Sequence, residues 1–250
     1  MFEPHILEGG SATESLPEVM ILASGYGTRL RPIVGDRPKV LAEVGGRPFL
    51  EWWLQTLATQ GIRQVTLCVG YKAGMIRDHF GSRWGEMGIR YSKEDSPLGT
   101  GGALARAAQQ ARGEWILALN GDSFCEIDLR VMWEAHRARR ALVTLAVTRS
   151  ADTRRFGRVH WERPGLVTQF EEKSNQGGFG WINAGVYLPP RERLMADAQG
   201  GACSLERDLL PAWIEPGLRV ESRTGRFIDI GTPESYLEAQ TFFDPAPEAA

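Results

Sequence analysis

The sequence predicts an α/β fold in which a mixed, mostly parallel β-sheet is flanked by helices. Between residues 18 and 147, short apolar runs alternate with longer segments of helical periodicity. This alternation is typical of strand–helix–strand units that build a parallel sheet. The chain has 250 residues, 42% of them hydrophobic, which is enough to bury a sizeable core in one domain. After residue 147 the alternation weakens, and shorter mixed or antiparallel strands are expected.

The charge balance excludes two classes of partner. The formal net charge is −2, whereas proteins whose main partner is nucleic acid or an anionic membrane favour a basic surface. No apolar run approaches the roughly 20 residues that a membrane span needs. Residues 1–17 carry acidic residues without a basic start and an apolar segment, so they are interpreted as a loose tail and not as a signal peptide. Residues 244–250 are interpreted as a second loose tail.

The cysteines indicate a reducing compartment. Cys68, Cys125 and Cys203 are scattered and form no C-x-x-C motif. Cys68 lies in an apolar run and is expected to be a small buried hydrophobic residue. An odd number of thiols without a pairing pattern favours the cytoplasm and gives no indication of a zinc site.

The first strand and the loop after it carry the most informative residues. An apolar run at Val19–Ala23 predicts a buried strand. The loop that follows contains Gly25 and Gly27, which allow main-chain N–H groups to approach an anion, and Arg29 and Lys39 add positive charge. The arrangement suits a polyphosphate, although a glycine-rich turn with scattered cations is an alternative explanation for the glycine pair. The run matches neither a Walker loop nor a dinucleotide-binding G-x-G-x-x-G motif.

The next four elements continue the alternation. A short strand-like run at residues 40–44 precedes a helix that Pro48 opens and Gly61 stops, because proline fits the first helical turn and glycine the residue after the last. A second buried strand is predicted at residues 65–69. A helix that ends near residue 80 follows it.

A second glycine-rich turn follows a strand at residues 89–92. The turn contains Gly99 and Thr100 and opens an alanine-rich helix that extends to about Ala111. Free N–H groups at a helix N-terminus can face a phosphate, although such a turn is often only a helix entry. Just before the turn, Glu94 could accept hydrogen bonds from two guanine donors at once, which favours GTP; the alternative is a solvated surface glutamate.

A clear buried strand at residues 115–119 is followed by Gly121 and Asp122. Ligands of open α/β sheets bind beyond the carboxyl ends of the strands, and a carboxylate there can hold Mg²⁺. The alternative role for Asp122 is to cap the next segment. Asp128 is predicted to be the N-cap of a helix at residues 129–140.

Shorter strands and two helices make up the rest of the chain. Strands are expected at residues 142–147, 156–159, 166–170 and 182–187, and a last strand leads into Asp229. The helices start at two N-capping residues, Ser204 and Thr232.

Several of these segments, in this order, resemble the sugar-1-phosphate nucleotidyltransferases, also called NDP-sugar pyrophosphorylases. The matching segments are GYGTRLRP and PKVL of the first loop, PLGTGGAL of the second, NGDS, EEK, NAG and FIDIGTPE. Ser24 is a departure, since relatives usually have glycine there. The resemblance covers residues 19–240. It implies a Rossmann-like, glycosyltransferase-A-like domain at residues 18–243, with a nucleotide-binding half (18–147) and a smaller sugar-binding β annex within the second half (148–243).

The resemblance also implies a site. It assigns catalytic roles to Arg29, Lys39, Asp122 and Lys173, and metal binding to Asp122 and Asp229. The residues assigned to the nucleotide are Ala23, Ser24, Gly25, Gly27, Thr28, Arg29, Glu94, Gly99, Thr100 and Gly121. On the sugar side, the resemblance assigns Glu172 and Asn183 to the hydroxyls, Lys173 to the phosphate of the sugar, and Gly157 to leaving room for the sugar.

The implied reaction joins a sugar 1-phosphate to a nucleoside triphosphate, giving an NDP-sugar and pyrophosphate, with Mg²⁺ as cofactor. The sequence CVGYKAGMI and the segments above most resemble those of guanylyltransferases that use GTP and D-glycero-D-manno-heptose 1-phosphate. Such enzymes serve the synthesis of capsule, S-layer or lipopolysaccharide precursors. Mannose-1-phosphate guanylyltransferases and glucose-1-phosphate thymidylyltransferases are alternatives. An inactive regulatory homologue is an alternative of another class. A homo-oligomer is possible, and neither nucleic acid nor membrane is an expected partner.

Overall fold

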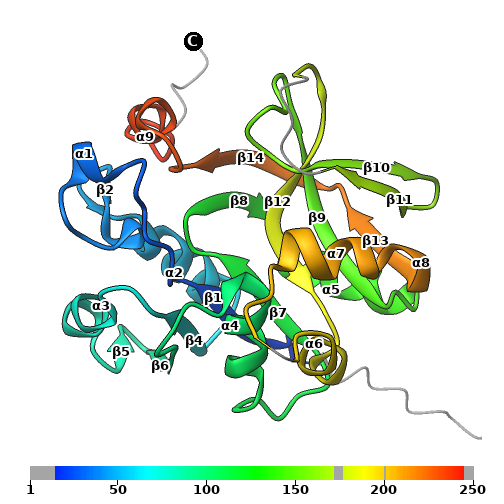
Figure 1. Cartoon of the computed structure of the whole chain (residues 1–250), viewed down its shortest axis with the longest axis horizontal. Helices are drawn as coiled ribbons and strands as arrows, with labels where there is room; N and C mark the ends of the chain where they lie inside the picture. The colour runs from blue at the N-terminus through cyan, green and yellow to red at the C-terminus, as the bar shows by residue number, and fades with distance from the viewer. Residues whose placement is uncertain (1–14, 172–176, 200, 245–250) are drawn as a thin grey trace, which may run out of the picture.

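The computed structural model describes residues 15–171, 177–199 and 201–244. Its central β-sheet has ten strands (Figure 1). These strands are β1 (Glu18–Leu22), β4 (Gln64–Val69), β5 (Arg83–Trp84), β6 (Met87–Lys93), β7 (Ile116–Asn120), β9 (Val143–Ser150), β10 (Arg158–Glu162), β11 (Leu166–Glu171), β12 (Gly180–Leu188) and β13 (Leu218–Glu221). Their order across the sheet is β10-β11-β13-β9-β12-β7-β1-β4-β6-β5.

Two small sheets and the helices complete the fold. The small sheets pair β2 (Glu43–Val44) with β3 (Arg47–Pro48), and β8 (Ser123–Ile127) with β14 (Thr224–Asp229). The helices are α1 (Arg31–Val34), η1 (Lys39–Leu41), α2 (Phe49–Thr59), α3 (Ala73–Phe80), α4 (Gly99–Ala108), α5 (Leu129–Ala138), α6 (Arg191–Asp197), η2 (Leu205–Leu209), α7 (Leu210–Ala212), α8 (Ile214–Gly217) and α9 (Pro233–Ala239).

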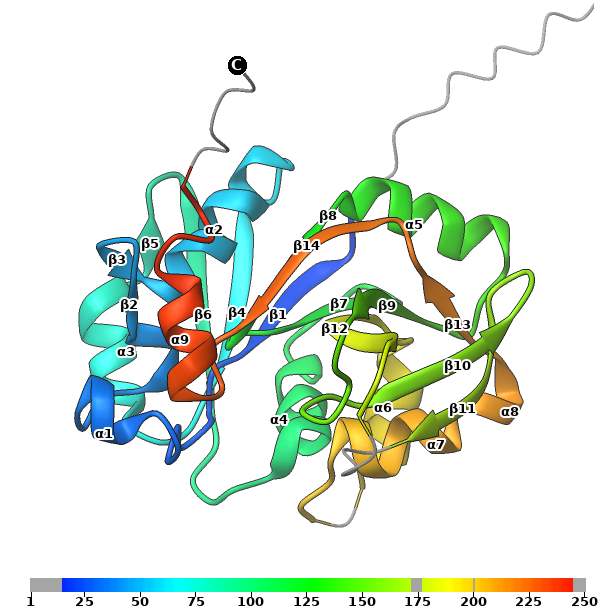
Figure 2. The ribbon, with the colours of Figure 1, turned by 90° about the horizontal axis from the view of Figure 1, so that it is seen from above.

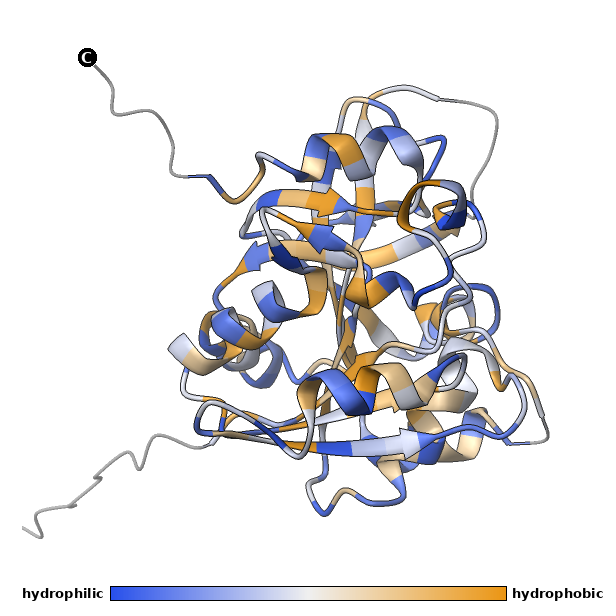
Figure 3. Cartoon of the chain, turned by 90° about the vertical axis from the view of Figure 1, so that its left-hand side faces the viewer, coloured by the Kyte–Doolittle hydropathy of each residue, from blue (hydrophilic) through white to orange (hydrophobic). Residues whose placement is uncertain are grey.

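The first half of the chain forms a parallel sheet, as the sequence predicts. Strands β7, β1, β4 and β6 pair in parallel, and alternate residues of β1 face opposite sides. Val19 and Ile21 pack in one core cluster with α2 and α3, whereas Met20 and Leu22 pack in a second cluster with α4. Apolar residues are concentrated on these central strands (Figure 3). Burial on both faces explains why the strand is a continuous apolar run and not an alternating one.

The second half has the mixed and antiparallel strands expected after residue 147, but it closes into a ring that the sequence does not predict. Strands β10, β11, β13, β9 and β12 follow one another in the sheet, and a further pairing of Arg158 with Ile182 joins β10 to β12, so the five strands close into a ring. Most pairings here are antiparallel. The reason is local: only residues 163–165 connect β10 to β11, which is enough for a hairpin but not for a crossover to a parallel strand. The β annex is therefore continuous with the main sheet.

The β8–β14 pair links the middle of the chain to its C-terminal part. In Figure 2, β14 runs between the two halves and places α9 beside the N-terminal elements. The Tyr236 hydroxyl on α9 donates to the Glu43 carbonyl at 2.6 Å, which anchors the helix there. In the β8–β14 pair, Asp229 lies opposite Ser123, the residue after Asp122. This pairing brings together two aspartates that are far apart in sequence.

Most other predicted elements are present, with local differences. Residues 40–44 are a short 3₁₀ helix followed by β2 and not one strand. The elements β8, α6 and β13 were not predicted from sequence because each is too short to show a clear periodicity, although turn-forming dipeptides precede all three. Cys68 and Cys125 are buried, and burial raises the pKa of both thiols to about 12. None of the helices in the described ranges is long and apolar enough to cross a membrane.

The predicted Asp128 cap is confirmed. Its Oδ1 accepts hydrogen bonds from the backbone N–H groups of Arg130 and Val131 at 2.9 and 3.0 Å. We expect Asp128→Ala to lower the free energy of unfolding by about 1 kcal/mol, because these donors lose their partner. Urea denaturation measures this loss. The exposed Asp95→Ala is the control, and equal stability of both variants would contradict the capping role.

Candidate active site

A cavity of about 450 Å³ lies at the carboxyl ends of β1 and β7 and extends toward the closed ring. Of the residues predicted from sequence, those that line it are Ala23, Ser24, Gly25, Arg29, Lys39, Glu94, Gly99, Thr100, Asp122, Gly157, Asn183 and Asp229. Gly27, Thr28 and Gly121 do not line it. Glu172 and Lys173 lie outside the described residues. The structure therefore brings most of the predicted set into one cavity.

The two glycines of the first loop have different surroundings. Gly27 has a φ of +59°, and a Cβ there would lie 3.1 Å from the Cβ of Lys39. Its carbonyl accepts hydrogen bonds from the backbone N–H groups of Leu30 and Arg31, which closes the turn. A Cβ on Gly25 would meet nothing within 4 Å. Gly27 therefore shapes the loop and positions Lys39, whereas Gly25 leaves open space at the cavity wall.

An ion pair joins Lys39 to Asp122. The Lys39 Nζ donates to Asp122 Oδ2 at 2.7 Å, and only 10% of the lysine side chain is exposed. Lys39 is buried in the short helix η1, and Asp122 follows β7. The pair fixes a positive charge at the floor of the cavity beside a carboxylate.

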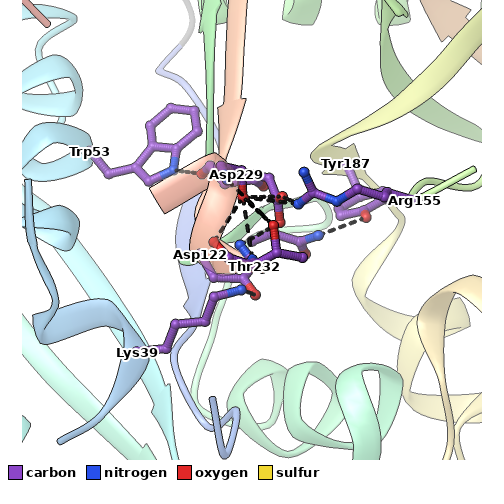
Figure 4. A network of polar contacts seen from close by, with 11 residues as sticks. Lys39, Trp53, Asp122, Arg155, Tyr187, Asp229 and Thr232 are labelled. Carbon is purple, nitrogen blue, oxygen red and sulfur yellow. Dashed lines mark hydrogen bonds and ion pairs between the residues drawn. The ribbon is translucent and has the colours of Figure 1, made fainter. Parts of the chain in front are cut away.

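A second ion pair lies beside the first (Figure 4). Arg155, which the sequence analysis did not single out, pairs with Asp229 Oδ1 and donates to Ser235 Oγ at 3.0 Å. The Gly231 N–H donates to the other oxygen of Asp229 at 3.0 Å. Arg155 lies two residues before Gly157, which the family resemblance assigns to the sugar side, but only its place beside Asp229 shows that the arginine belongs to the site.

Asp122 and Asp229 form a donor set that fits Mg²⁺. The Ile230 N–H donates to the Asp122 carbonyl at 3.0 Å, so the backbones that carry the two aspartates are directly bonded. Within the described ranges, no group of three or more His, Cys, Asp or Glu side chains is placed to hold a metal. Mg²⁺ is commonly bound by one or two carboxylates together with substrate phosphates, so two aspartates are sufficient. These two residues would be its protein ligands.

The second glycine-rich turn does not present its helix N-terminus as predicted. The N–H groups of Gly101 and Gly102 donate to the Cys203 carbonyl at 2.8 and 3.2 Å. A Cβ on Gly99 would lie 2.5 Å from the same carbonyl oxygen. The expectation that free N–H groups of this helix face a phosphate is therefore wrong for these two, because a segment about 100 residues further along the chain occupies them.

Thr100 and Glu94 both stabilise the loops around this turn. The Thr100 hydroxyl donates to Glu206 Oε2 at 2.8 Å, and Glu206 also lines the cavity. Glu94 Oε2 accepts a hydrogen bond from the Leu98 N–H at 3.1 Å. Glu94 thus orders the turn with one oxygen while it lines the cavity. That Glu94 accepts hydrogen bonds from the guanine base of GTP stays a prediction.

A buried tyrosine organises the ring end of the cavity. The Tyr187 hydroxyl accepts hydrogen bonds from the side-chain amides of Asn183 and Asn120 at 2.8 and 3.3 Å. Burial raises the pKa of Tyr187 well above its usual value, so the phenol stays neutral. Asn183 Oδ1 accepts from the Gly185 N–H at 2.8 Å. Asn183 therefore holds the irregular part of β12 as well as lining the cavity. Asn120 lines it too and was missed from sequence.

Gly157 makes room for a protein side chain. A Cβ there would lie 2.7 Å from the ring of Phe170, which itself lines the cavity. The glycine was expected to leave space for a sugar. The structure shows that the ring of Phe170 takes up the space on this side, so any effect of Gly157 on a ligand passes through the position of that ring.

Comparison with known proteins gives a consistent result. The family model described as "Nucleotidyl transferase" matches residues 18–244. A D-glycero-alpha-D-manno-heptose 1-phosphate guanylyltransferase of Aneurinibacillus thermoaerophilus is 37% identical over 224 residues, which are 89% of this chain and 96% of that protein. A mannose-1-phosphate guanylyltransferase of Mycobacterium tuberculosis is 35% identical over 88% of this chain but only 62% of its own length.

Solved structures agree with the fold. HddC from Yersinia pseudotuberculosis complexed with GMP-PN is 31% identical, with a TM-score of 0.78 over 90% of this chain and 98% of that one. A putative glucose-1-phosphate thymidylyltransferase from Bacillus anthracis, crystallised in complex with a sucrose, has a TM-score of 0.81 over 93% of this chain and 97% of that one, at 20% identity. At that identity the second match supports the α/β fold alone.

Proposed function

The chain belongs to the nucleotidyl transferase family, and on that premise we propose that it transfers the guanylyl group of GTP to a sugar 1-phosphate. The products are a GDP-sugar and pyrophosphate. We further propose D-glycero-α-D-manno-heptose 1-phosphate as the sugar substrate, since guanylyltransferases named for it match almost their full length to this chain.

One observation carries the proposal most directly. The first glycine loop, Lys39, Asp122 and Asp229 line a single cavity although they come from the N-terminal part, the middle and the C-terminal part of the chain. The cavity has cations for a triphosphate on one side and polar side chains of the ring on the other. Two substrates could therefore meet between the halves.

The reaction needs positioning and charge stabilisation more than it needs a base. The phosphate oxygen of a sugar 1-phosphate is already anionic near neutral pH. The difficulty is to bring two polyanions together and to stabilise charge at the α-phosphorus during in-line displacement. Lys39, held at the cavity floor by Asp122, and Arg29 at its wall would neutralise the triphosphate and the departing pyrophosphate. Lys173 is assigned by family resemblance to orient the attacking phosphate.

We propose Mg²⁺ as the cofactor, with Asp122 and Asp229 as its protein ligands. When bound, the ion supplies Lewis-acid stabilisation of phosphate charge. The two aspartates fit this role because their backbones are hydrogen-bonded to each other's strands and their side chains line the same cavity.

The proposal places the protein in the cytoplasm, where free thiols such as Cys68 and Cys125 persist and where GTP is available. A product of this kind would serve the synthesis of capsule, S-layer or lipopolysaccharide precursors. The proposal includes a homo-oligomer, and size-exclusion chromatography with light scattering measures the oligomeric state.

Pyrophosphate release across a matrix of four NTPs and several sugar 1-phosphates tests the function. We expect the highest kcat/KM with GTP and the heptose 1-phosphate. If GTP with mannose 1-phosphate gives the highest value, the sugar assignment is wrong, and if dTTP with glucose 1-phosphate does, the base assignment is wrong as well. Absence of pyrophosphate with every pair would favour an inactive regulatory homologue.

A further inference from the structure

Arg155 is the least expected charged residue in the cavity. Its guanidinium pairs with Asp229 Oδ1 and donates to Ser235 Oγ, while its Nε is buried without a hydrogen-bond partner among the described residues. The guanidinium also lies 5.4 Å from the centre of the Phe156 ring. Arg155 is 36% exposed, whereas Asp229 is only 17% exposed. The pair is therefore partly shielded from water at the aspartate end.

Both oxygens of Asp229 are already engaged. Oδ1 receives Arg155 and, at 3.3 Å, the Ser235 hydroxyl, and Oδ2 receives the Gly231 N–H. A divalent cation and a guanidinium attract the same carboxylate and repel each other. A cation that binds to Asp229 therefore competes with Arg155 for this carboxylate.

Arg155 lies close to the part of the cavity where the displaced guanidinium could bind a phosphate. The next two residues, Phe156 and Gly157, line the cavity on the ring side, together with Asn183. This is the side that the proposed function assigns to the sugar 1-phosphate. A planar guanidinium can bind phosphate oxygens through two parallel hydrogen bonds, and Arg155 uses only one of its terminal nitrogens toward Asp229 and Ser235.

We propose that Arg155 is a positioning residue that neutralises Asp229 before a divalent cation binds and then transfers its guanidinium to the phosphate of the sugar 1-phosphate. The inference rests on the proposed function for the identity of that phosphate. It couples the two binding events: each divalent cation that binds releases an arginine for the acceptor, and each acceptor that binds removes a competitor of the cation.

Mn²⁺ binding to the substrate-free protein tests the first half of this exchange. Titration followed by electron paramagnetic resonance of free Mn²⁺ needs no turnover. We expect Arg155→Gln to bind Mn²⁺ about five- to tenfold more tightly than the unmodified protein, because a competing ion pair of this exposure is removed. Unchanged or weaker binding, or no Mn²⁺ binding by either protein, would overturn the proposal.

Adding the sugar 1-phosphate tests the second half. We expect saturating acceptor to tighten Mn²⁺ binding to the unmodified protein by about fivefold or more, and to Arg155→Gln by less than twofold. The KM of the variant for the acceptor should rise at least about tenfold with the KM for GTP unchanged. Equal tightening in both proteins would contradict the exchange.

The neighbouring arginine provides the matched control. Arg154 forms an exposed ion pair with Asp152, with Nε 2.8 Å from Oδ2, and does not line the cavity. Arg154→Gln should leave Mn²⁺ affinity, acceptor coupling and both KM values as they are. Failure of the proposed function has a different signature: no pyrophosphate would form with the unmodified protein, whether or not Mn²⁺ affinity changes in Arg155→Gln.

Discussion

Asp122→Asn is expected to reduce kcat at least about a thousandfold, which corresponds to about 4 kcal/mol of lost transition-state stabilisation. Asparagine has nearly the same shape as aspartate but lacks its negative charge. The substitution therefore weakens the proposed Mg²⁺ site and the charge that holds Lys39 at 2.7 Å in the cavity floor. Pyrophosphate release at saturating GTP and acceptor measures the effect.

The fold of this variant should remain intact. The Asp122 side chain is 43% exposed, and the side-chain carbonyl of asparagine can still accept a hydrogen bond from Lys39, whose own side chain is only 10% exposed. Asp128→Asn is the matched control: it makes the same chemical change outside the cavity, and asparagine caps helices as well as aspartate does. Both variants should unfold at the same urea concentration as the unmodified protein. Retained Mg²⁺-dependent turnover in Asp122→Asn would remove Asp122 from the metal role.

Gly121→Ala should have the largest effect on stability. A Cβ at this position would lie 2.4 Å from the Leu22 carbonyl oxygen, which also accepts the Gly121 N–H at 2.9 Å. The new methyl group must push β1 and β7 apart at the ends that carry the site. We expect a loss of about 2–3 kcal/mol, which for a chain of this size lowers Tm by roughly 5–10 °C.

Gly25→Ala separates this packing effect from ligand binding. A Cβ on Gly25 would meet nothing within 4 Å, yet Gly25 lines the cavity. Its Tm should therefore stay within about 1 °C of the unmodified value, while the KM for GTP rises because the methyl group stands where a phosphate would approach. Thermal melts of both variants measure the change in Tm, and initial rates measure the change in the KM for GTP. A Gly121→Ala variant that melts normally and only binds GTP weakly would restore the nucleotide role predicted from sequence.

Sequence patterns predicted the structure correctly where the residues in contact lie within a few positions of each other along the chain. The continuous apolar run of β1 indicated a strand buried on both faces, and Asp128 indicated the N-cap that the structure confirms. The order of the short motifs indicated the family, because each motif combines glycines and charges at a spacing that few other sites share.

Sequence patterns did not predict the surroundings of a residue where its spatial neighbour is distant in the sequence. The predicted free helix N-terminus after Gly99 is occupied by the Cys203 carbonyl, and the space beside Gly157 is filled by Phe170. No property of the sequence around either glycine indicates these partners. Arg155 was missed for the same reason, since its importance depends entirely on Asp229.

The sequence by itself determined the family, the parallel half of the sheet, the helix caps and half of the residues that line the cavity. Only the tertiary structure decided that the second half closes into a ring, that Lys39 pairs with Asp122 and that Arg155 covers Asp229. The physical reason is that periodicity and capping depend on neighbours along the chain. Ion pairs across the cavity depend instead on strand register and on the path of β14, which pairs Asp229 with the residue after Asp122.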